Sequence, residues 1–243
     1  MTVDTEEQEG RSGTHQQPRP AGPPGPIERV SRSTETAMAW YEAAAPWYDR
    51  FADPFEASVR SSGIDLLAVE PGESVLDVGC GTGRALVEFA SDVGADGRAV
   101  GLDLAPAMCR ETQAALEERG LDETADIVRG DARSIPIADD AVDAVFASFV
   151  LELFDTPTIP TVLEEWRRIL DPGGRICVVA LSRRTAGPVT RLYELVHRLA
   201  PTAADCRPIY LRETLAEAGF RPLETRHERV WYLPAEVVVA DLR

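Results

Sequence analysis

The chain has 243 residues and a formal net charge of −16, because 41 aspartates and glutamates outnumber 25 basic residues, all of them arginine. Such an acidic surface repels phosphate groups, which argues against a nucleic-acid-binding protein and against a polybasic membrane contact. The hydrophobic fraction of 44% is ordinary for a folded domain, and no apolar run reaches the roughly 18 residues that span a bilayer. We therefore expect a soluble, cytoplasmic protein, for which peripheral membrane contact remains open.

The N-terminal region differs in composition from the rest of the chain. Residues 1–30 combine closely spaced prolines and glycines with charge and show no hydrophobic periodicity, which is typical of a disordered tail. We place a single domain at residues 31–243. It opens with a helical, lid-like segment at about residues 34–60. The densest group of aromatic side chains in the chain falls there and includes Trp40, Tyr41, Trp47 and Tyr48.

Short apolar strands and helical patterns alternate from residue 74 onward. Strands are predicted at residues 74–78, 98–102, 126–129, 141–148 and 175–181. Helices are predicted at residues 84–90, 106–119, 160–170, 189–199 and 211–218. The alternation predicts an α/β fold, a doubly wound parallel sheet with helices on both faces. The last two segments, 222–233 and 236–242, predict an antiparallel hairpin at the sheet edge, which brings the number of strands to seven.

The most informative segment is the first strand with the glycine-rich loop Gly79–Gly83 that follows it. Closely spaced glycines between a strand and a helix let the backbone approach a ligand without obstruction by Cβ atoms. The dinucleotide-binding pattern needs its third glycine one position later, where this chain has Arg84. A chain without lysine also lacks the Tyr-x-x-x-Lys pair of a common dehydrogenase family. Both observations disfavour an NAD-dependent oxidoreductase.

Three acidic residues stand at regular places around this loop. Asp103 ends the second strand, where a carboxylate can accept hydrogen bonds from both hydroxyls of a ribose. Asp131 follows the third strand and is placed to accept from an adenine amino group. Asp77 lies inside the first strand, and a buried carboxylate is costly unless it has a partner. We expect a cationic ligand or the backbone amides of the loop to supply that partner.

At these positions the chain resembles the class I S-adenosylmethionine-dependent methyltransferases, and in particular their ubiquinone/menaquinone C-methylase-like branch. The residues that carry the resemblance are 75–83, 101–103, 130–132 and 163–174, and it extends from about residue 40 to the C-terminus. It implies a Rossmann-like fold with S-adenosylmethionine as cofactor. The cofactor-binding residues that it implies are Asp77, Gly79, Cys80, Gly81, Thr82, Gly83, Asp103, Leu104, Asp131, Ala132 and Ser148.

Catalytic residues are harder to predict than the cofactor site. Methyl transfer is an in-line displacement at an activated methyl group, so alignment and exclusion of water supply much of the acceleration. A carbon or phenol acceptor also requires a base. The candidates are Tyr48 in the aromatic segment, Glu152 after the fourth strand and His197 in the helix at 189–199. Each has a structural alternative, which is aromatic packing for Tyr48, a helix cap for Glu152 and a purely structural helical histidine for His197.

The helix predicted at residues 189–199 bears on the acceptor. Its apolar stripe consists of Val189, Leu192, Tyr193, Val196 and Leu199. Its polar residues off the stripe are Arg191, Glu194 and Arg198. Such a stripe packs as core or covers a hydrophobic substrate. Together with the aromatic segment it favours a small hydrophobic acceptor and quinone-type C-methylation, although residues 148–152 lack the Asn-x-x-Asp-like run of that branch.

Two alternatives to quinone methylation stay open. One is N-methylation of a phospholipid or small amine, and the other is a non-catalytic cofactor-binding module on the same fold. The four cysteines lie far apart, with no CxxC and no neighbouring histidine, so we expect reduced thiols and no metal site. The acid excess predicts a salt-loving source, because concentrated salt screens self-repulsion. GC-rich coding explains the missing lysine but not the excess of acid.

Overall fold

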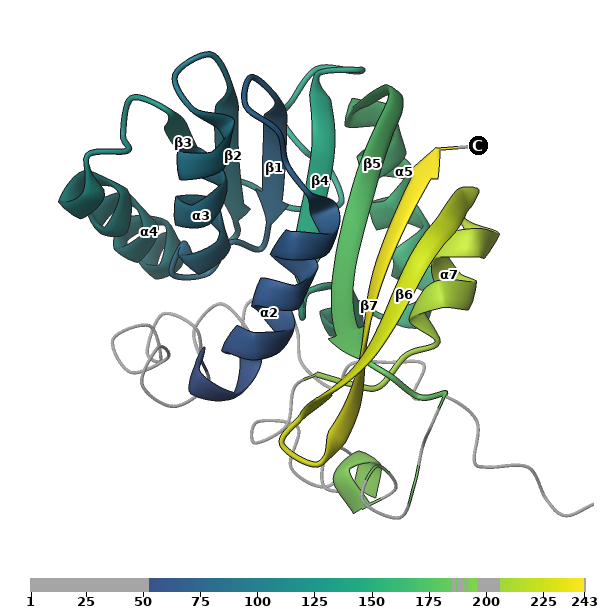
Figure 1. Cartoon of the computed structure of the whole chain (residues 1–243). Coiled ribbons are helices and arrows are strands. Elements are labelled where there is room, and N and C mark those ends of the chain that lie inside the picture. The colour runs from purple at the N-terminus through teal and green to yellow at the C-terminus, as the bar shows by residue number, and fades with distance from the viewer. Residues whose placement is uncertain (1–52, 185–186, 188–189, 191, 196–205, 243) are drawn as a thin grey trace, which may run out of the picture.

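The computed structural model describes residues 53–184, 187, 190, 192–195 and 206–242 (Figure 1). The helices and strands are, in chain order, α2 (Asp53–Leu67), β1 (Ser74–Val78), α3 (Arg84–Val93), β2 (Arg98–Asp103), α4 (Pro106–Arg119), β3 (Ala125–Arg129), β4 (Val142–Ser148), η1 (Leu151–Leu153), η2 (Thr156–Thr158), α5 (Ile159–Ile169), β5 (Leu170–Leu181), α7 (Leu211–Glu217), β6 (Phe220–Val230) and β7 (Leu233–Leu242).

All seven strands belong to one sheet, in the order β3-β2-β1-β4-β5-β7-β6. The first five strands pair in parallel, whereas β7 is antiparallel to both of its neighbours, β5 and β6. The predicted α/β architecture, a mostly parallel seven-stranded sheet with an antiparallel C-terminal hairpin, is confirmed. The hairpin lies at the edge of the sheet, as predicted, and β6 is its outer strand.

Helices cover both faces of the sheet (Figure 1). Side chains of α2, α3 and α4 pack on one face, and those of α5 and α7 pack on the other. The two faces follow from the alternation of side chains along each strand. In β4, for example, Val145 and Ala147 join the core under α5 and α7, whereas Ala144 and Phe146 join the core under α2 and α3. Phe146 packs edge-to-face on Phe89 of α3, with ring centroids 5.2 Å apart.

The C-terminal end of α2 is held by Arg175 of β5. Its guanidinium donates to the carbonyl oxygens of Leu67 and Ala68 at 2.7 Å each, and it pairs with Glu73 at 2.8 Å. These bonds satisfy carbonyl groups that the end of a helix leaves without partners. The C-terminal end of α2 is thus fixed beside the start of β5. The N-terminal end of α2 lies beside the C-terminal ends of the parallel strands (Figure 1).

Two predicted boundaries in the C-terminal half are wrong. The hairpin turns at residues 231–232 and not at residues 234–235, because pairing of β7 with β5 already includes Ala235, opposite Leu181. The fifth strand begins at Leu170, which pairs with Val142. The predicted turn at residues 171–174 is a bulge within that strand. Both errors arise because strand pairing, and not the local turn residues, fixes the register.

Some predictions concern parts of the chain that the structure does not describe. The predicted tail at residues 1–30 and the lid segment up to residue 52 lie outside the described residues, and so do Trp40, Tyr41, Trp47 and Tyr48. The described part of that segment belongs to α2, which continues beyond residue 60 to Leu67. Within the described ranges, no helix is both long and apolar enough to cross a bilayer.

Candidate functional site

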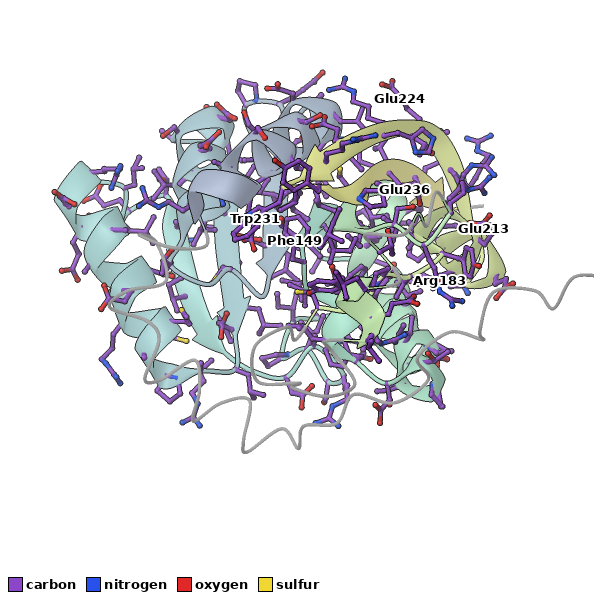
Figure 2. The ribbon with its side chains drawn as sticks, turned by 90° about the horizontal axis from the view of Figure 1, so that it is seen from below. Phe149, Arg183, Glu213, Glu224, Trp231 and Glu236 are labelled. Atoms are coloured by element: carbon purple, nitrogen blue, oxygen red, sulfur yellow. The ribbon has the colours of Figure 1, made fainter. Side chains whose placement is uncertain are left out.

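The candidate site lies at the edge of the sheet where the parallel strands end, which is the edge seen in Figure 2. The loops after β1, β2 and β3 meet there because these strands are neighbours and run in the same direction. The N–H of Gly79 donates to the carbonyl of Leu102 at 2.7 Å, and the N–H of Gly130 donates to the carbonyl of Asp103 at 3.0 Å. The loops after β1 and β3 are therefore both hydrogen-bonded to the end of β2, which lies between them.

The three glycines of the first loop all have positive φ, at +67° for Gly79, +57° for Gly81 and +82° for Gly83. They differ in what surrounds them. A Cβ atom on Gly79 would overlap the side chain of Val150, and one on Gly83 would lie 2.6 Å from the methyl group of Thr112. A Cβ atom on Gly81 would meet nothing within 4 Å. Two of the glycines thus permit packing within the protein, and Gly81 leaves open space for a ligand.

Asp103 connects the first two loops. One carboxylate oxygen accepts from the N–H of Gly81 at 3.0 Å, and the other accepts from the N–H of Ala105 at 2.8 Å. Burial raises the pKa of Asp103, while these backbone amides act in the opposite direction. A carboxylate has about four lone-pair positions. Asp103 therefore fixes the loop and keeps capacity for the ribose hydroxyls that the sequence predicts.

Asp77 is a buried acid beneath the loop. Its side chain is 2% exposed, and within the described residues Oδ2 has no hydrogen-bond partner. Burial raises the pKa of Asp77 to about 7, and the negative charge of Asp103 adds to this effect. The positive charge of Arg60 and the backbone amide of Leu86, at the start of α3, lower it. An unpartnered carboxylate oxygen here suits a cationic ligand, which is one of the two predicted partners.

The third loop carries Asp131 and Ala132. Asp131 accepts from the backbone N–H and from Nε of Arg133, both at 2.9 Å, and this contact lowers its pKa. Its carboxylate is thus ionised and oriented by its own loop. Ala132 is buried, and Leu104 of the neighbouring loop is half-buried. The geometry places Asp131 beside the loop of Asp103, as the predicted adenine contact requires.

Cys80 and Thr112 fasten the glycine loop to α4. The hydroxyl of Thr112 donates to the carbonyl of Gly81 at 2.7 Å and lies 3.9 Å from the thiol of Cys80. Burial raises the pKa of this thiol well above its usual value, so it is no nucleophile. Thr82 is half-buried in the same loop. All four cysteines are free thiols, and no cluster of three potential metal ligands occurs among the described residues.

The region where we expect the acceptor, called the acceptor side below, begins where β4 ends, at the half-buried Ser148. The next residue, Phe149, has φ of +57°, which is uncommon and strained for a bulky side chain. Its N–H donates to the carbonyl of Val179 in β5 at 2.9 Å. Its ring is buried in the apolar cluster that includes Leu181 and Val230. The strained turn therefore directs an aromatic ring into the apolar core next to the ends of β4 and β5.

Glu152 lies three residues further on, in η1, and is fully buried. The predicted alternative for residues 148–152, a helix start with a capping role, holds for the helix start only, because η1 begins at Leu151 without a side-chain cap. Instead, Oε1 accepts from the N–H of Leu181 at 3.1 Å, and Oε2 has no hydrogen-bond partner in the described part of the chain. Burial raises the pKa of Glu152 to about 8, against the positive charge of Arg207. A protonated acid thus connects the ends of β4 and β5 at neutral pH.

A buried ion pair next to this region was not predicted. Nε of Arg183, just after β5, lies 2.9 Å from Oε1 of Glu194, and both side chains are buried. The guanidinium also lies 5.7 Å from the ring centroid of Tyr210. The predicted stripe is therefore wrong at two positions, since Glu194 faces inward whereas Leu192 is 62% exposed. The only signal in the sequence was a charged residue directly after an apolar strand.

Two of the three predicted catalytic residues, Tyr48 and His197, lie outside the described residues. The third, Glu152, lies at the acceptor side. Every predicted cofactor residue is described, and ten of the eleven lie in the loops after β1, β2 and β3 or at the ends of β1 and β2. The remaining one, Ser148, ends the adjacent strand β4.

The fold and this site define a class I methyltransferase domain, and comparisons with known proteins agree. A family model described as a methyltransferase domain matches residues 75–174. The chain is 30% identical over 181 residues to demethylmenaquinone methyltransferase of Renibacterium salmoninarum, an alignment that covers 72% of each protein. It is 35% identical over 169 residues to nocamycin O-methyltransferase of Saccharothrix syringae, covering 67% of this chain and 59% of that protein.

Solved structures show the same fold. A SAM-dependent methyltransferase from Aquifex aeolicus superposes with a TM-score of 0.62 at 21% identity, covering 83% of this chain and 98% of that one. The chain belongs to the class I S-adenosylmethionine-dependent methyltransferases. Within them it falls in the branch of the ubiquinone/menaquinone C-methyltransferases. S-adenosylmethionine is its cofactor, and the open space at Gly81 and the unpartnered oxygen of Asp77 fit this cationic molecule.

Proposed function

We propose that the protein transfers a methyl group from S-adenosylmethionine to a ring carbon of a small hydrophobic acceptor of the quinone type. The observation that carries this proposal is the combination of apolar surroundings with one neutral acid after β4. Phe149, Leu181 and Val230 belong to one apolar cluster, and the carboxyl group of Glu152 lies against the end of β5. The similarity to a protein named demethylmenaquinone methyltransferase supports the same acceptor class.

In this proposal the glycine loop and three acids hold the cofactor. S-adenosylmethionine supplies a methyl group that a positively charged sulfur activates. We assign Asp103 to the ribose hydroxyls and Asp131, with Ala132, to the adenine. We assign Asp77 to the positive charge of the cofactor, because its buried oxygen has no other described partner. Ser148 then lies between the cofactor side and the acceptor side.

Glu152 is the proposed proton acceptor. A phenol-type ring reacts at carbon more readily after its hydroxyl has lost a proton, so the reaction needs a base. With a pKa of about 8, the Glu152 carboxyl is protonated at pH 7 and becomes a base as the pH rises through 8. The positive charge of Arg207 favours the ionised form. His197 is the alternative base, and Tyr48 is a further candidate catalytic residue.

Transfer of an isotopically labelled methyl group tests this function. The full chain is incubated in molar salt with methyl-labelled S-adenosylmethionine and a short-tailed demethylmenaquinol, the reduced form, which carries the hydroxyl that loses a proton. The matched control is the same quinol already methylated at the acceptor carbon. We expect label on the ring carbon of the first compound and none on the control. Cofactor binding without any labelled product, on this or any other acceptor, would instead identify a non-catalytic module.

A second acceptor class is a hydroxyl group, which the similarity to nocamycin O-methyltransferase favours. Glu152 would remove the hydroxyl proton in the same way. The same labelling assay, repeated with a phospholipid amine and a small amine as acceptors, separates the classes, because the position of the label distinguishes a carbon, an oxygen and a nitrogen acceptor. Label on the nitrogen of a phospholipid or small amine would identify an N-methyltransferase and would overturn the quinone proposal.

A further inference from the structure

The turn between β6 and β7 carries two large aromatic side chains. Val230 pairs with Leu233, so Trp231 and Tyr232 form a two-residue turn. Their exposed fractions are 65% and 77%. Trp231 has φ of +57°, a conformation for which such turns normally use glycine or asparagine. We call Trp231 and Tyr232 the aromatic tip. The tip has two unfavourable features, which are the backbone conformation of Trp231 and the exposure of two aromatic rings to water.

The aromatic tip lies at the edge of the sheet that carries the candidate site. The hairpin projects beyond the ends of the parallel strands in Figure 1, and Figure 2 shows Trp231 and Phe149 on the same edge of the molecule. The residues next to the tip continue inward, since Val230 belongs to the apolar cluster of Phe149 and Leu233 packs against that cluster. The exposed tip is thus joined directly to the buried apolar cluster that contains Phe149.

The strand that leads to the tip differs in charge from the rest of the protein. β6 contains three arginines and two glutamates, so its formal charge is +1, whereas the whole chain carries −16. Arg226 pairs with Glu224 within the strand at 3.0 Å. Arg229 lies two residues before Trp231. The tip is therefore flanked by a cation in an otherwise acidic molecule.

We propose that the aromatic tip inserts into the interfacial region of a lipid bilayer, from which a lipophilic acceptor reaches the site. Tryptophan and tyrosine are the side chains enriched at this depth of a membrane, and arginine binds lipid phosphate well. A stable protein partner would bury about 800 Å² on each side, which a two-residue tip does not offer. The proposal rests on the proposed function only for the lipophilic character of the acceptor.

Vesicle binding tests this proposal without acceptor or cofactor. The full chain is floated with phosphatidylcholine vesicles, which offer no amine to methylate, in low salt and in 1 M salt. The test variant combines Trp231→Gly with Tyr232→Ser. Glycine suits the positive φ of position 231, so this variant should fold at least as well as the unaltered chain. The matched control is Leu223→Ser, an exposed apolar residue of the same strand, roughly 25 Å from the tip at 3.3 Å per residue.

We expect the unaltered chain and the Leu223→Ser variant to bind the vesicles equally. The tip variant should bind about tenfold more weakly or worse, because partial burial of two aromatic rings is worth at least one decade in affinity. Binding should be equal or stronger in 1 M salt, which screens repulsion and strengthens apolar burial. A purely electrostatic contact would weaken in salt.

Three results would overturn the proposal. One is that the unaltered chain binds no vesicles, and another is that the tip variant binds as well as the unaltered chain. The third is that the tip variant raises the KM for a short-tailed, water-soluble acceptor as much as for a vesicle-embedded one, which would assign the tip to the acceptor site. Vesicle binding does not depend on methyl transfer, so failure of the proposed function leaves this test intact.

Discussion

The cofactor side and the acceptor side of this site are built by different means. On the cofactor side, neighbouring loops meet largely through backbone groups, as when the amides of Gly81 and Ala105 hold Asp103. On the acceptor side, buried side chains join segments that are far apart in the chain. Glu152 reaches the amide of Leu181, and Arg207 donates to the carbonyl of Phe154 at 3.2 Å.

This difference separates two tasks. Backbone amides and glycine conformations can hold one invariant cofactor, and they are set by a short run of residues. The acceptor side depends on particular side chains, and a single substitution there can change what is bound or how it is deprotonated. We therefore expect substitutions on the two sides to have distinct effects, with losses of cofactor affinity on one side and losses of stability or turnover on the other.

The largest effect is expected on the acceptor side, from Glu194→Ala. This change removes the buried carboxylate that lies 2.9 Å from Nε of Arg183, and breaking such a buried pair costs about 3–5 kcal/mol of unfolding free energy. Denaturant unfolding measures the loss. The control is Glu213→Ala, which removes the exposed partner of the adjacent Arg184 and should cost less than about 1 kcal/mol. Equal costs for the two variants would contradict the structural role of the buried pair.

Two glycines of the glycine-rich loop, Gly79 and Gly81, should differ in how much stability their replacement by alanine costs. Gly79→Ala adds a Cβ atom that overlaps Val150 and should cost about 2–4 kcal/mol of stability. Val150→Ala in the same chain should recover part of this loss. Gly81→Ala meets open space and should cost only about 1–2 kcal/mol, from its positive φ.

The Gly81→Ala variant should lose affinity for S-adenosylmethionine by at least about tenfold, or 1.4 kcal/mol, because the new methyl group occupies the ligand's space. Calorimetry on the folded variant measures this. An affinity equal to that of the unaltered chain would mean that the ligand does not approach the loop at Gly81.

A smaller effect is expected from Asp103→Ala. Loss of charged hydrogen bonds to the ribose should weaken cofactor binding by about 1–3 kcal/mol, while the methyl-transfer rate at saturating cofactor changes little. Isothermal titration with S-adenosylmethionine, with NAD as a ligand that should not bind, checks this. Unchanged affinity would place the ribose contact elsewhere.

The sequence predicted the positions of the strands, loops and helices on the cofactor side well, because these positions depend on local residues. The glycine loop lies directly between β1 and α3, and α4 runs from Pro106 to Arg119 with Gly120 in the left-handed conformation after it, as predicted. The positions of Asp103 and Asp131 follow from the ends of consecutive strands. Short-range rules for strands, caps and glycines are sufficient for such features.

The acceptor side could not be predicted in the same way. The partner of Glu152 is an amide 29 residues away, and Glu194 turns inward because Arg183 is buried beside it. The hairpin turn at Trp231 contradicts ordinary turn preferences, and the pairing of β7 with β5 decides its place. These features depend on tertiary contacts, which a single sequence does not reveal.

In the proposed mechanism, the buried carboxyl group of Glu152 removes a proton during methyl transfer. The most direct test is the pH profile of the methyl-transfer rate, at saturating cofactor, for the unaltered chain and the Glu152→Gln variant. We predict that the rate of the unaltered chain rises through about pH 8, as the Glu152 carboxyl ionises. The variant should be at least about 100-fold slower, with no such rise and unchanged cofactor affinity. Equal rates and parallel pH profiles for the unaltered chain and the variant would show that Glu152 is not the proton acceptor.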